Sequence, residues 1–413
     1  MTEDEAFLQD ILAQPDDDTP RLVYADWLED HGDPDRAEFI RVQCELDKLG
    51  EWDERWEELK QREQRALRGY RKEWLGGAEG LVRKWEFRRG FLDSAHVRPK
   101  DLAAFGEELF RRAPLRHVRL SGIFGDPALR ALAASSHLAK VRSLEFYYFR
   151  LDAPRLAALL ASPHLGGLRA LHLNGCVIGP DGARLLAGSP NLAGLTALRL
   201  RNGDIGPAGA GALAGSPHLA RLEALDLTLN GIVDEGLTTL ASSPRLANLT
   251  DLRVQANRIG RGGVEALAAA RHWRLARLSL GTNPLGNEGV RLLTASPHAG
   301  HLTWLQLGVN DVVRGPEAAA ALAESRHLSR LTTLIWYRSN LGDDGARALA
   351  DSPHLTRLVE LVLFSNGITD AGAQALLDSP YLTRLRRVDL RDHSISRKQK
   401  ALWRARFGKN VAF

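Results

Sequence analysis

A repeat of about 27 residues constrains the fold of this chain more than any other feature of its sequence. The run Leu168-x-x-Leu171-x-Leu173 returns with the same internal spacing 27 residues later, at Leu195. A fixed period of this length is typical of solenoid proteins, whose units stack along one axis and bury a continuous core. The steps are 26 or 27 residues apart from one of 29, and the eleven units begin at Leu115, Val141, Leu168, Leu195, Leu222, Leu249, Leu275, Leu302, Leu331, Leu358 and Leu385.

Each unit predicts a short strand, a turn and a helix. The leucines of L-x-x-L-x-L alternate with other residues, as in a strand with one buried face. Eight residues after the first leucine, five units carry an asparagine, and we expect its buried amide to hydrogen-bond the backbone of the turn. A helix with inward-facing leucines follows, and a Ser-Pro pair often ends it. The asparagines are Asn230, Asn257, Asn283, Asn310 and Asn366, with Cys176 in the equivalent place.

The unequal widths of strands and helices predict curvature. Parallel strands stack about 4.8 Å apart, whereas packed helices need about 8–10 Å. We therefore expect an α/β, right-handed solenoid, a horseshoe with parallel strands on its concave face and helices outside. Its period and the motif Gly-Ala-x-x-Leu-Ala-x-Ser-Pro-His-Leu resemble the ribonuclease-inhibitor-like class of leucine-rich repeats over residues 115–395. This resemblance implies α/β units and protein binding.

The segments outside the repeats predict a small all-α N-terminal module and two caps. We expect a helical module at 1–50, a helical linker at 51–89, a capping repeat at 90–114 and a C-terminal cap at 396–413. Helix starts are indicated by the capping box of Thr2 and Glu5, by Thr19-Pro20 and by Asp33-Pro34. The break in repeat pattern predicts that deleting residues 1–76 leaves a folded solenoid.

The N-terminal module also has a recognisable sequence. The run Arg21-Leu-Val-Tyr-Ala-Asp-Trp-Leu-Glu-Asp-His-Gly-Asp-Pro34, continued by Arg36-Ala-Glu-Phe-Ile-Arg41, resembles the bacterial repeat-companion domain. That family sits at the N-terminus of repeat proteins and has no assigned activity. The resemblance implies a bacterial, cytoplasmic protein. Three further features favour a cytoplasmic protein that does not contact a membrane. They are two widely spaced cysteines, an acidic N-terminus and the absence of a long apolar stretch.

Charge is distributed unevenly along the chain. Residues 1–50 hold 15 acidic and 4 basic side chains, although the whole chain has a net charge of +4. Three explanations fit this pattern. The charges could support a contact within the chain, steer an acidic partner, or form a solvated surface without a role.

The sequence offers no catalytic or cofactor motif. Phosphate-binding glycine loops, a nucleophile elbow and zinc-ligand spacings are all missing, so we expect neither an enzyme nor a cofactor or metal. Histidine recurs at one position of the repeat, where it would form a ladder that binds a metal or, as we favour, hydrogen-bonds the loop before each strand. The ladder comprises His137, His164, His218, His272, His298, His327 and His354.

Residues between the strand leucines point away from the core and define the candidate binding surface. The middle repeats place a basic strip there, formed by Arg199, Arg201, Arg253 and Arg277. Aromatic and aliphatic residues interrupt it at Tyr147 and Tyr148 and, further along, at Trp304, Ile335, Tyr337, Val362 and Phe364. Exposed aromatics and arginines are typical of contact surfaces, although cross-strand packing alone explains them as well.

These features favour a non-catalytic scaffold, adaptor or inhibitor that binds an unidentified protein on the concave face as a monomer. The centre would be Trp304, Tyr337 and Phe364, on outward positions of three successive strands beside the longer loop Asn310–Pro316. A binder of polyanions or nucleic acid using the basic strip is the alternative, and a regulator of a partner enzyme is the second. The aromatics cluster apart from the arginines, which favours protein over single-stranded nucleic acid.

Overall fold

The computed structural model describes residues 2–50, 53–70, 73–75, 78, 80–120, 125–308 and 315–413. Internal contacts divide the chain into two compact units. Unit 1 comprises Met1–Phe149 and Ala158–His172, and unit 2 comprises Arg150–Ala157 and Leu173–Phe413. Within the described residues, the strands follow one another in chain order from β1 to β14.

Unit 1 begins with the helical N-terminal module. Thr2 and Glu5 form the expected capping box at the first helix, and the Asp33 side chain accepts a hydrogen bond from the Arg36 backbone at the third. Both caps satisfy backbone donors that a helix start leaves open. The helices of this part are α1 (Glu3–Ala13), α2 (Thr19–Asp30), α3 (Pro34–Leu46) and α4 (Trp56–Tyr70).

A β-hairpin follows the module, and its first strand lies where the sequence suggested helix. Residues 82–88, expected within a helical linker, form strand β1 (Val82–Arg88), which pairs antiparallel with β2 (Phe91–Val97). The two residues between the strands, Arg89 and Gly90, both have positive φ, at 49° and 85°. Such a two-residue turn matches the twist of a hairpin. The first pair of the sheet is therefore antiparallel, whereas the repeat strands are parallel.

The N-terminal module shares its hydrophobic core with this hairpin. Phe91 of β2 belongs to the same buried cluster as Ile11, Leu28 and Ile40 of the module helices. At Gly90, a Cβ atom would lie 2.5 Å from a side-chain carbon of Ile40, so only glycine fits this contact. The module is thus packed onto the start of the sheet.

Ion pairs reinforce the same interface. The Asp47 carboxylate accepts from Arg88 Nε at 2.6 Å and from Arg89 Nε at 2.7 Å. Arg116, just before β3, donates to Asp16 Oδ1 at 2.6 Å. A contact within unit 1, one of three explanations for the acidic N-terminal segment, is therefore present in the structure.

The rest of unit 1 contains the first repeats, and two elements cross into unit 2. The elements are α5 (Pro99–Arg112), β3 (His117–Leu120), α6 (Asp126–Ala134) and β4 (Ser143–Tyr147), while α7 (Ala153–Leu160) and β5 (Ala170–Asn174) span the boundary between the units.

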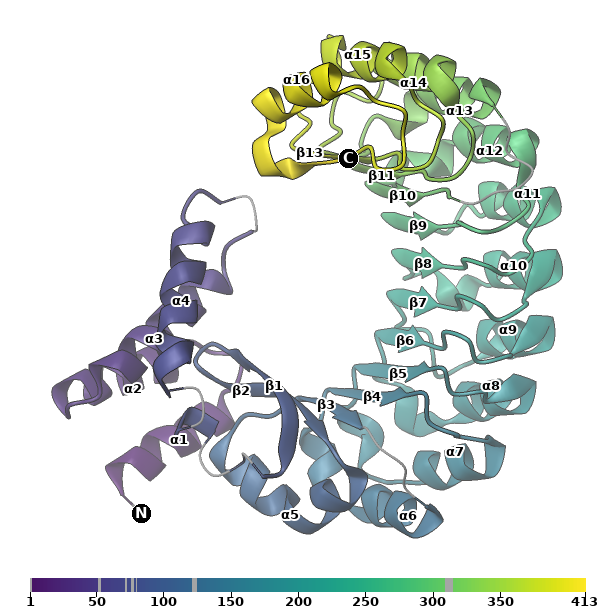
Figure 1. Ribbon diagram of the computed structural model, residues 1–413. Helices are drawn as coiled ribbons and strands as arrows, with labels where there is room; N and C mark the ends of the chain where they lie inside the picture. Colours follow the sequence, from purple (N-terminus) through teal and green to yellow (C-terminus); the bar gives the residue numbers. More distant parts are fainter. Residues whose placement is uncertain are drawn as a thin grey trace. The chain divides into compact units, whose positions relative to one another are not determined.

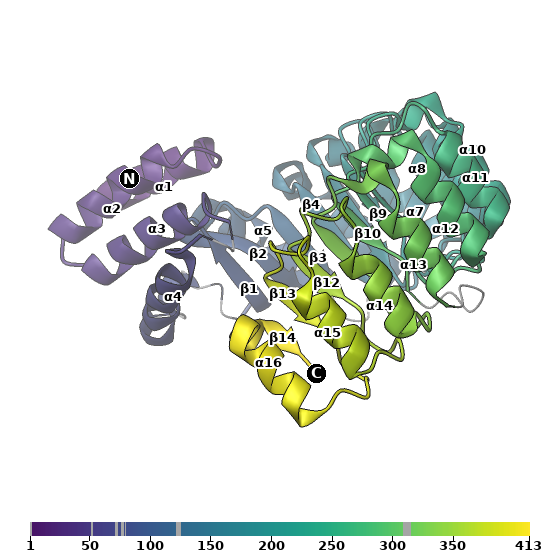
Figure 2. The same cartoon turned by 90° about the horizontal axis from the view of Figure 1, so that it is seen from above.

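Unit 2 repeats one strand and one helix per turn of the chain, as the sequence predicts. Leu225, Leu252 and Leu278 lie opposite one another in register, all buried. Figures 1 and 2 show the unit 2 helices side by side along one face of its strands. The elements are α8 (Gly179–Gly188), β6 (Ala197–Arg199), α9 (Gly206–Gly215), β7 (Ala224–Asp226), α10 (Val233–Ala241), β8 (Asp251–Arg253), α11 (Arg261–Ala269), β9 (Arg277–Ser279), α12 (Gly286–Ala295), β10 (Trp304–Gln306), α13 (Pro316–Ala323), β11 (Thr333–Ile335), α14 (Gly342–Ala350), β12 (Glu360–Val362), α15 (Asp370–Asp378), β13 (Arg387–Asp389), α16 (Arg397–Phe407) and β14 (Val411–Ala412).

Two hydrogen-bond ladders join successive repeats of unit 2. The Asn230 side chain accepts from the backbone N–H groups of Gly203 and Ile205 and donates to the Leu200 carbonyl at 2.8 Å, which confirms the expected role of the asparagines. The second ladder uses serines that follow the repeat helices, among them Ser216, Ser243 and Ser352. Ser216 Oγ donates to the Ala187 carbonyl at 2.6 Å in the preceding repeat. Each ladder pairs buried backbone groups that otherwise have no partner in the repeat.

The stacked leucine core predicts a clear difference between two neighbouring substitutions. Leu225 is 1% exposed, so Leu225→Ala should lower the free energy of unfolding by about 3 kcal/mol through the cavity it leaves. Arg221 is exposed, and Arg221→Ala should cost less than about 0.5 kcal/mol. Thermal melting of both variants measures the difference, and equal losses would contradict the assigned register.

His393 takes the asparagine position in the last repeat, 27 residues after Asn366. Its Nδ1 accepts from the Ile368 N–H at 3.0 Å, and its Nε2 lies 2.9 Å from the Leu363 carbonyl, to which it donates. Only the neutral ring makes both bonds. Burial lowers the pKa of this imidazole accordingly.

The acid response of the last repeats should therefore depend on His393. Because the pKa is lower in the folded than in the unfolded chain, the unfolded chain binds the proton first as the pH falls below about 6.5. The contribution of His393 to the free energy of unfolding is complete above that pH and is lost below it. Urea unfolding at pH 7.5 and 5 should show a smaller acid-induced loss for His393→Asn than for the unsubstituted protein. Identical acid-induced losses of stability in the two proteins would contradict the assignment of a neutral His393 ring.

Candidate functional site

The strands of unit 2 have one face turned away from α8–α15, which we call the open face. Side chains on it alternate with the buried leucines, as in β10, where Leu305 is buried between half-buried Trp304 and Gln306. Successive strands align these side chains in rows. Trp304 lies opposite Arg277 and Thr333, and Ile335 lies opposite Gln306 and Val362.

Five predicted contact residues come together on this face. We call Trp304, Ile335, Tyr337, Val362 and Phe364 the aromatic patch, and each is half-buried. These side chains do not lie in one row of the sheet. Trp304 opens strand β10, Ile335 and Val362 end β11 and β12, and Tyr337 and Phe364 follow two residues beyond those ends. The patch therefore runs diagonally over three neighbouring strands.

The two rings at the end of the patch are held in place. Tyr337 and Phe364 stack with centroids 4.7 Å apart and an interplanar angle of 6°. The Tyr337 ring lies over Gly308, where a Cβ atom would approach the ring to 2.6 Å. Gln306 Nε2 donates to the Tyr337 hydroxyl at 3.2 Å. Rings fixed before binding lose little conformational entropy when a partner arrives.

The other end of the patch joins an ionic cluster. The Arg277 guanidinium lies 4.6 Å from the Trp304 ring centroid. Its Nε is 3.3 Å from Asp251 Oδ2, and Arg253 Nη2 is 2.9 Å from the same oxygen. Asp251 thus neutralises part of the basic strip that the sequence predicts. Arg199 and Arg201 of that strip are exposed.

The other predicted aromatic pair belongs to unit 1. Tyr147 and Tyr148 are 56% and 69% exposed and make an edge-to-face contact with centroids 4.6 Å apart. Tyr148 has a φ of 51°, which turns the chain away from the strand direction directly after β4. Both rings present large apolar area to solvent, as expected of a contact surface.

The repeated histidines are half-buried, and within the described residues none of their rings hydrogen-bonds the loop that we expected them to hold. In several repeats the serine two residues earlier holds the loop instead, as where Ser216 Oγ accepts from the backbone N–H groups of His218 and Leu219. His137 instead stacks on Phe110 at 5.7 Å, and burial lowers the pKa of its ring. In the described segments, no group of three or more His, Cys, Asp or Glu side chains is placed to hold a metal ion.

Most of the lengthened loop Asn310–Pro316 lies outside the described residues, so its place beside the aromatic patch stays a prediction.

Over the residues that the structure describes, every helix is too short or too polar to cross a bilayer.

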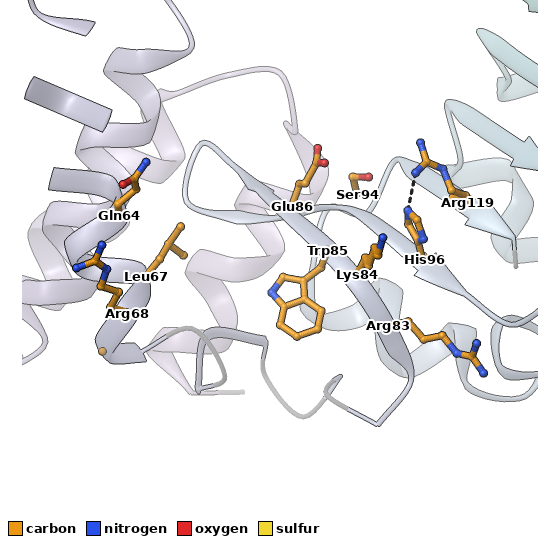
Figure 3. A pocket seen from close by; sticks show the side chains of 11 residues that line it. Gln64, Leu67, Arg68, Arg83, Lys84, Trp85, Glu86, Ser94, His96 and Arg119 are labelled. Carbon is orange, nitrogen blue, oxygen red and sulfur yellow. Dashed lines mark hydrogen bonds between the residues drawn. The ribbon is translucent and has the colours of Figure 1, made fainter. Parts of the chain in front are cut away.

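A cavity in unit 1 was missed by the sequence reasoning. It measures about 1300 Å³ and lies between the end of α4, the β1–β2 hairpin and β3 (Figure 3). Its signal in the sequence was Arg83-Lys84-Trp85-Glu86, in a segment that we expected to be helical. The lining consists of Gln64, Leu67, Arg68, Gly69, Arg83, Lys84, Trp85, Glu86, Ser94, His96 and Arg119.

Comparison with known proteins supports the repeat assignment. Residues 168–187, 195–214, 218–241, 245–268 and 353–377 match the family model described as Leucine Rich repeat. Together with the strand and helix order, this match confirms the α/β leucine-rich-repeat solenoid preceded by a helical module. A comparison with curated proteins gives no significant match.

Several solved structures are similar to this chain. An internalin (inlF) from Listeria monocytogenes is 21% identical over 70% of each chain, with a TM-score of 0.40. The Rad7 and Elc1 complex in yeast gives 14% identity over 91% of this chain and 92% of that chain, with a TM-score of 0.45. The TLR13–ssRNA13 complex gives 20% identity over 68% of this chain and 36% of that chain, with a TM-score of 0.41.

Proposed function

We propose that this leucine-rich-repeat chain is a non-catalytic interaction scaffold, an adaptor or inhibitor, that binds a protein partner on the open face of unit 2. The observation that carries the proposal is the aromatic patch. Five apolar side chains from three neighbouring strands meet on a face that their own helices leave uncovered. Large aromatic anchors surrounded by arginines are the groups that dominate binding energy at protein interfaces.

The patch has the anatomy of an interface centre with a polar rim. Its rings are fixed by stacking, by Gly308 and by Gln306. Arg338 and Arg391 lie 5.9 and 5.6 Å from the Phe364 ring centroid, and Arg277 covers Trp304. Apolar cores with charged rims are typical of specific interfaces. Packing across strands explains the Tyr337–Phe364 stack, but it does not explain why Trp304, Ile335 and Val362 continue the apolar surface.

The basic strip supports the polyanion alternative less well. Arg253 and Arg277 share Asp251 as an ionic partner, which removes part of their charge from the surface. Only Arg199 and Arg201 of the four predicted arginines lack such a partner among the described residues. We therefore assign the arginines to the rim, where they steer association and contribute modest affinity. Regulation of an enzyme by binding to it is one form that the scaffold function can take.

Further parts of the proposal rest on the sequence resemblances. The repeats fit the ribonuclease-inhibitor-like class, since each unit 2 period of about 27 residues holds one strand and one helix. Residues 1–50 fit the repeat-companion domain, with 51–89 as linker, 90–114 and 396–413 as caps, and 115–395 as repeats. We propose a bacterial cytoplasmic protein that acts as a monomer, and the two buried cysteine thiols agree with that compartment.

Affinity measurements on patch variants test the proposal. The full chain serves as bait for partners from its native host, and a captured partner is then titrated. Trp304→Ala and the double variant Tyr337→Ala/Phe364→Ala should each lower affinity by at least about 2 kcal/mol, because each removes an anchor. Melting temperatures show that the variants remain folded.

The matched control changes charge on the same face. The double variant Arg199→Ala/Arg253→Ala should mainly slow association and reduce its dependence on salt. If the aromatic variants bind normally while the arginine variant does not, the open face recognises a polyanion and the scaffold proposal fails.

A further inference from the structure

The cavity in unit 1 is lined by one helix and three strands, α4 and β1 to β3. Gln64, Leu67 and Arg68 enter from the last turns of α4, and Arg83 to Glu86 come from β1. Ser94, His96 and Arg119 come from β2 and β3. Figure 3 shows the Trp85 indole between the α4 side chains and the side chains of Lys84, His96 and Arg119. The lining is therefore polar, aromatic and rich in cations.

The cations of this cavity differ from those around it. Arg62, on the same helix as Arg68, is paired with Glu38, and Arg88 at the end of β1 is paired with Asp47. By contrast, Arg68, Arg83 and Lys84 have no carboxylate within ion-pairing distance among the described residues, and all three are exposed. Of the lining residues, Glu86 is the single carboxylate. Three unpaired cations facing one space give that space a positive potential.

His96 and Arg119 extend the wall of the cavity toward β4. Arg119 Nε donates to Glu145 at 2.6 Å, and its Nη1 donates to His96 Nε2 at 2.8 Å. Since a guanidinium only donates, His96 accepts and keeps its proton on Nδ1. Burial and then the charges of Arg119 and Lys84 lower the pKa of His96, as a cationic surrounding requires. The ring thus stays neutral and offers a donor.

Aromatic rings lie within and beside this wall. Trp85 lines the cavity itself. On the next strand, Glu145 is the register partner of Arg119, and the strand ends at the exposed rings of Tyr147 and Tyr148. Cations that follow a backbone and aromatic rings that stack on bases are the two features of sites for single-stranded nucleic acid.

We propose that unit 1 binds single-stranded nucleic acid, with Arg68, Arg83 and Lys84 along the phosphates and Trp85, Tyr147 and Tyr148 as stacking surfaces. The volume of about 1300 Å³ exceeds the range of about 300–1,000 Å³ typical of small-molecule sites and suits a segment of a polymer. A duplex is disfavoured because its bases are already stacked and offer no free faces to the rings.

An acidic protein segment is the competing occupant. It would also be attracted by the cations, but it would bury its anchors in apolar pockets. Leu67 and Trp85 are the only large apolar side chains among the lining residues. Exposed rings beside unpaired cations therefore favour nucleic acid.

Fluorescence anisotropy with the full chain tests the proposal. The probe is a labelled single-stranded oligothymidylate of about 15 nucleotides, titrated at several salt concentrations. The double variant Arg83→Ala/Lys84→Ala should weaken binding at least about tenfold and lower the slope of log affinity against log salt by roughly 2. The double variant Tyr147→Ala/Tyr148→Ala should weaken binding about as much and leave that slope unchanged.

Controls separate this site from the open face of unit 2. Arg221→Ala/Arg245→Ala removes the same charge from exposed positions of unit 2 and should leave binding unchanged, as should Tyr337→Ala/Phe364→Ala. The proposal would be overturned by an absence of binding at low salt or by equal affinity for a duplex of the same length. Equal losses of affinity in Arg83→Ala/Lys84→Ala and in Arg221→Ala/Arg245→Ala would overturn it as well. A labelled polyglutamate peptide that binds as tightly and loses affinity in the same variants would assign the cavity to an acidic protein instead.

Discussion

We expect Asn257→Ala to lower the free energy of unfolding by about 3–5 kcal/mol. The Asn257 side chain is fully buried. Its Oδ1 accepts from the backbone N–H groups of Asn230 and Ile232, at 2.9 and 3.2 Å. Its Nδ2 donates to the carbonyls of Leu227 and Gln255, at 2.8 and 2.9 Å. Alanine would leave three of these backbone groups without a partner, because the Gln255 carbonyl still accepts from the Leu229 N–H at 2.9 Å. Each such buried group costs about 1–3 kcal/mol.

Asn248 provides the matched control. It is exposed and donates one hydrogen bond to the Ala220 carbonyl at 2.8 Å, so Asn248→Ala should cost less than about 1 kcal/mol. Urea unfolding gives both free energies, and its slope shows whether the repeats still unfold together. Similar losses in the two variants would show that the asparagine ladder does not stabilise the stack.

The second large effect concerns the N-terminal module. Deleting residues 1–76 should unfold the beginning of unit 1, because Phe91 would lose its cluster with Ile11, Leu28 and Ile40. The deletion also removes the Gln43 side chain, which accepts from the Gly90 N–H at 2.7 Å, and the Asp47 partner of Arg88 and Arg89. This expectation reverses the one drawn from the sequence, in which the module was separable.

A point substitution tests the same interface with less disturbance. Phe91 is 5% exposed, and Phe91→Ala should cost about 3–5 kcal/mol. Phe105 on α5 is 49% exposed, and Phe105→Ala should cost less than about 0.5 kcal/mol. Size-exclusion chromatography and near-ultraviolet circular dichroism of the deletion variant complete the test. A soluble, fully folded deletion variant would show that the module is separable after all.

The sequence by itself determined the repeating part of the fold. The period places Leu225, Leu252 and Leu278 in one buried row, because a shift of one residue would turn every leucine to the other face. The same period placed Asn230 at the turn and Ile335 beside Val362. These are local or next-repeat relations, which a fixed spacing specifies completely.

The tertiary structure alone decided which of the marked residues act together. A spacing does not say that Arg253 and Arg277 share Asp251, since this depends on side-chain conformations across two strands. The repeat spacing placed Trp304, Tyr337 and Phe364 on successive strands. It did not specify that Trp304 lies two rows away from Tyr337 and Phe364.

The largest differences from the sequence reasoning occur where the repeat ends. The hairpin of Val82–Val97 forms because Arg89 and Gly90 adopt positive φ, and it lies against the module because Gly90 leaves room for Ile40. Neither the Arg89–Gly90 turn nor the Gly90–Ile40 contact belongs to the repeat, so the period did not indicate them. The cavity between α4 and this hairpin, and the shared core of Phe91 with Ile11, exist only because segments outside the repeats, which are not neighbours in sequence, pack together. Such contacts depend on the shapes of both surfaces, which periodicity in one of them does not specify.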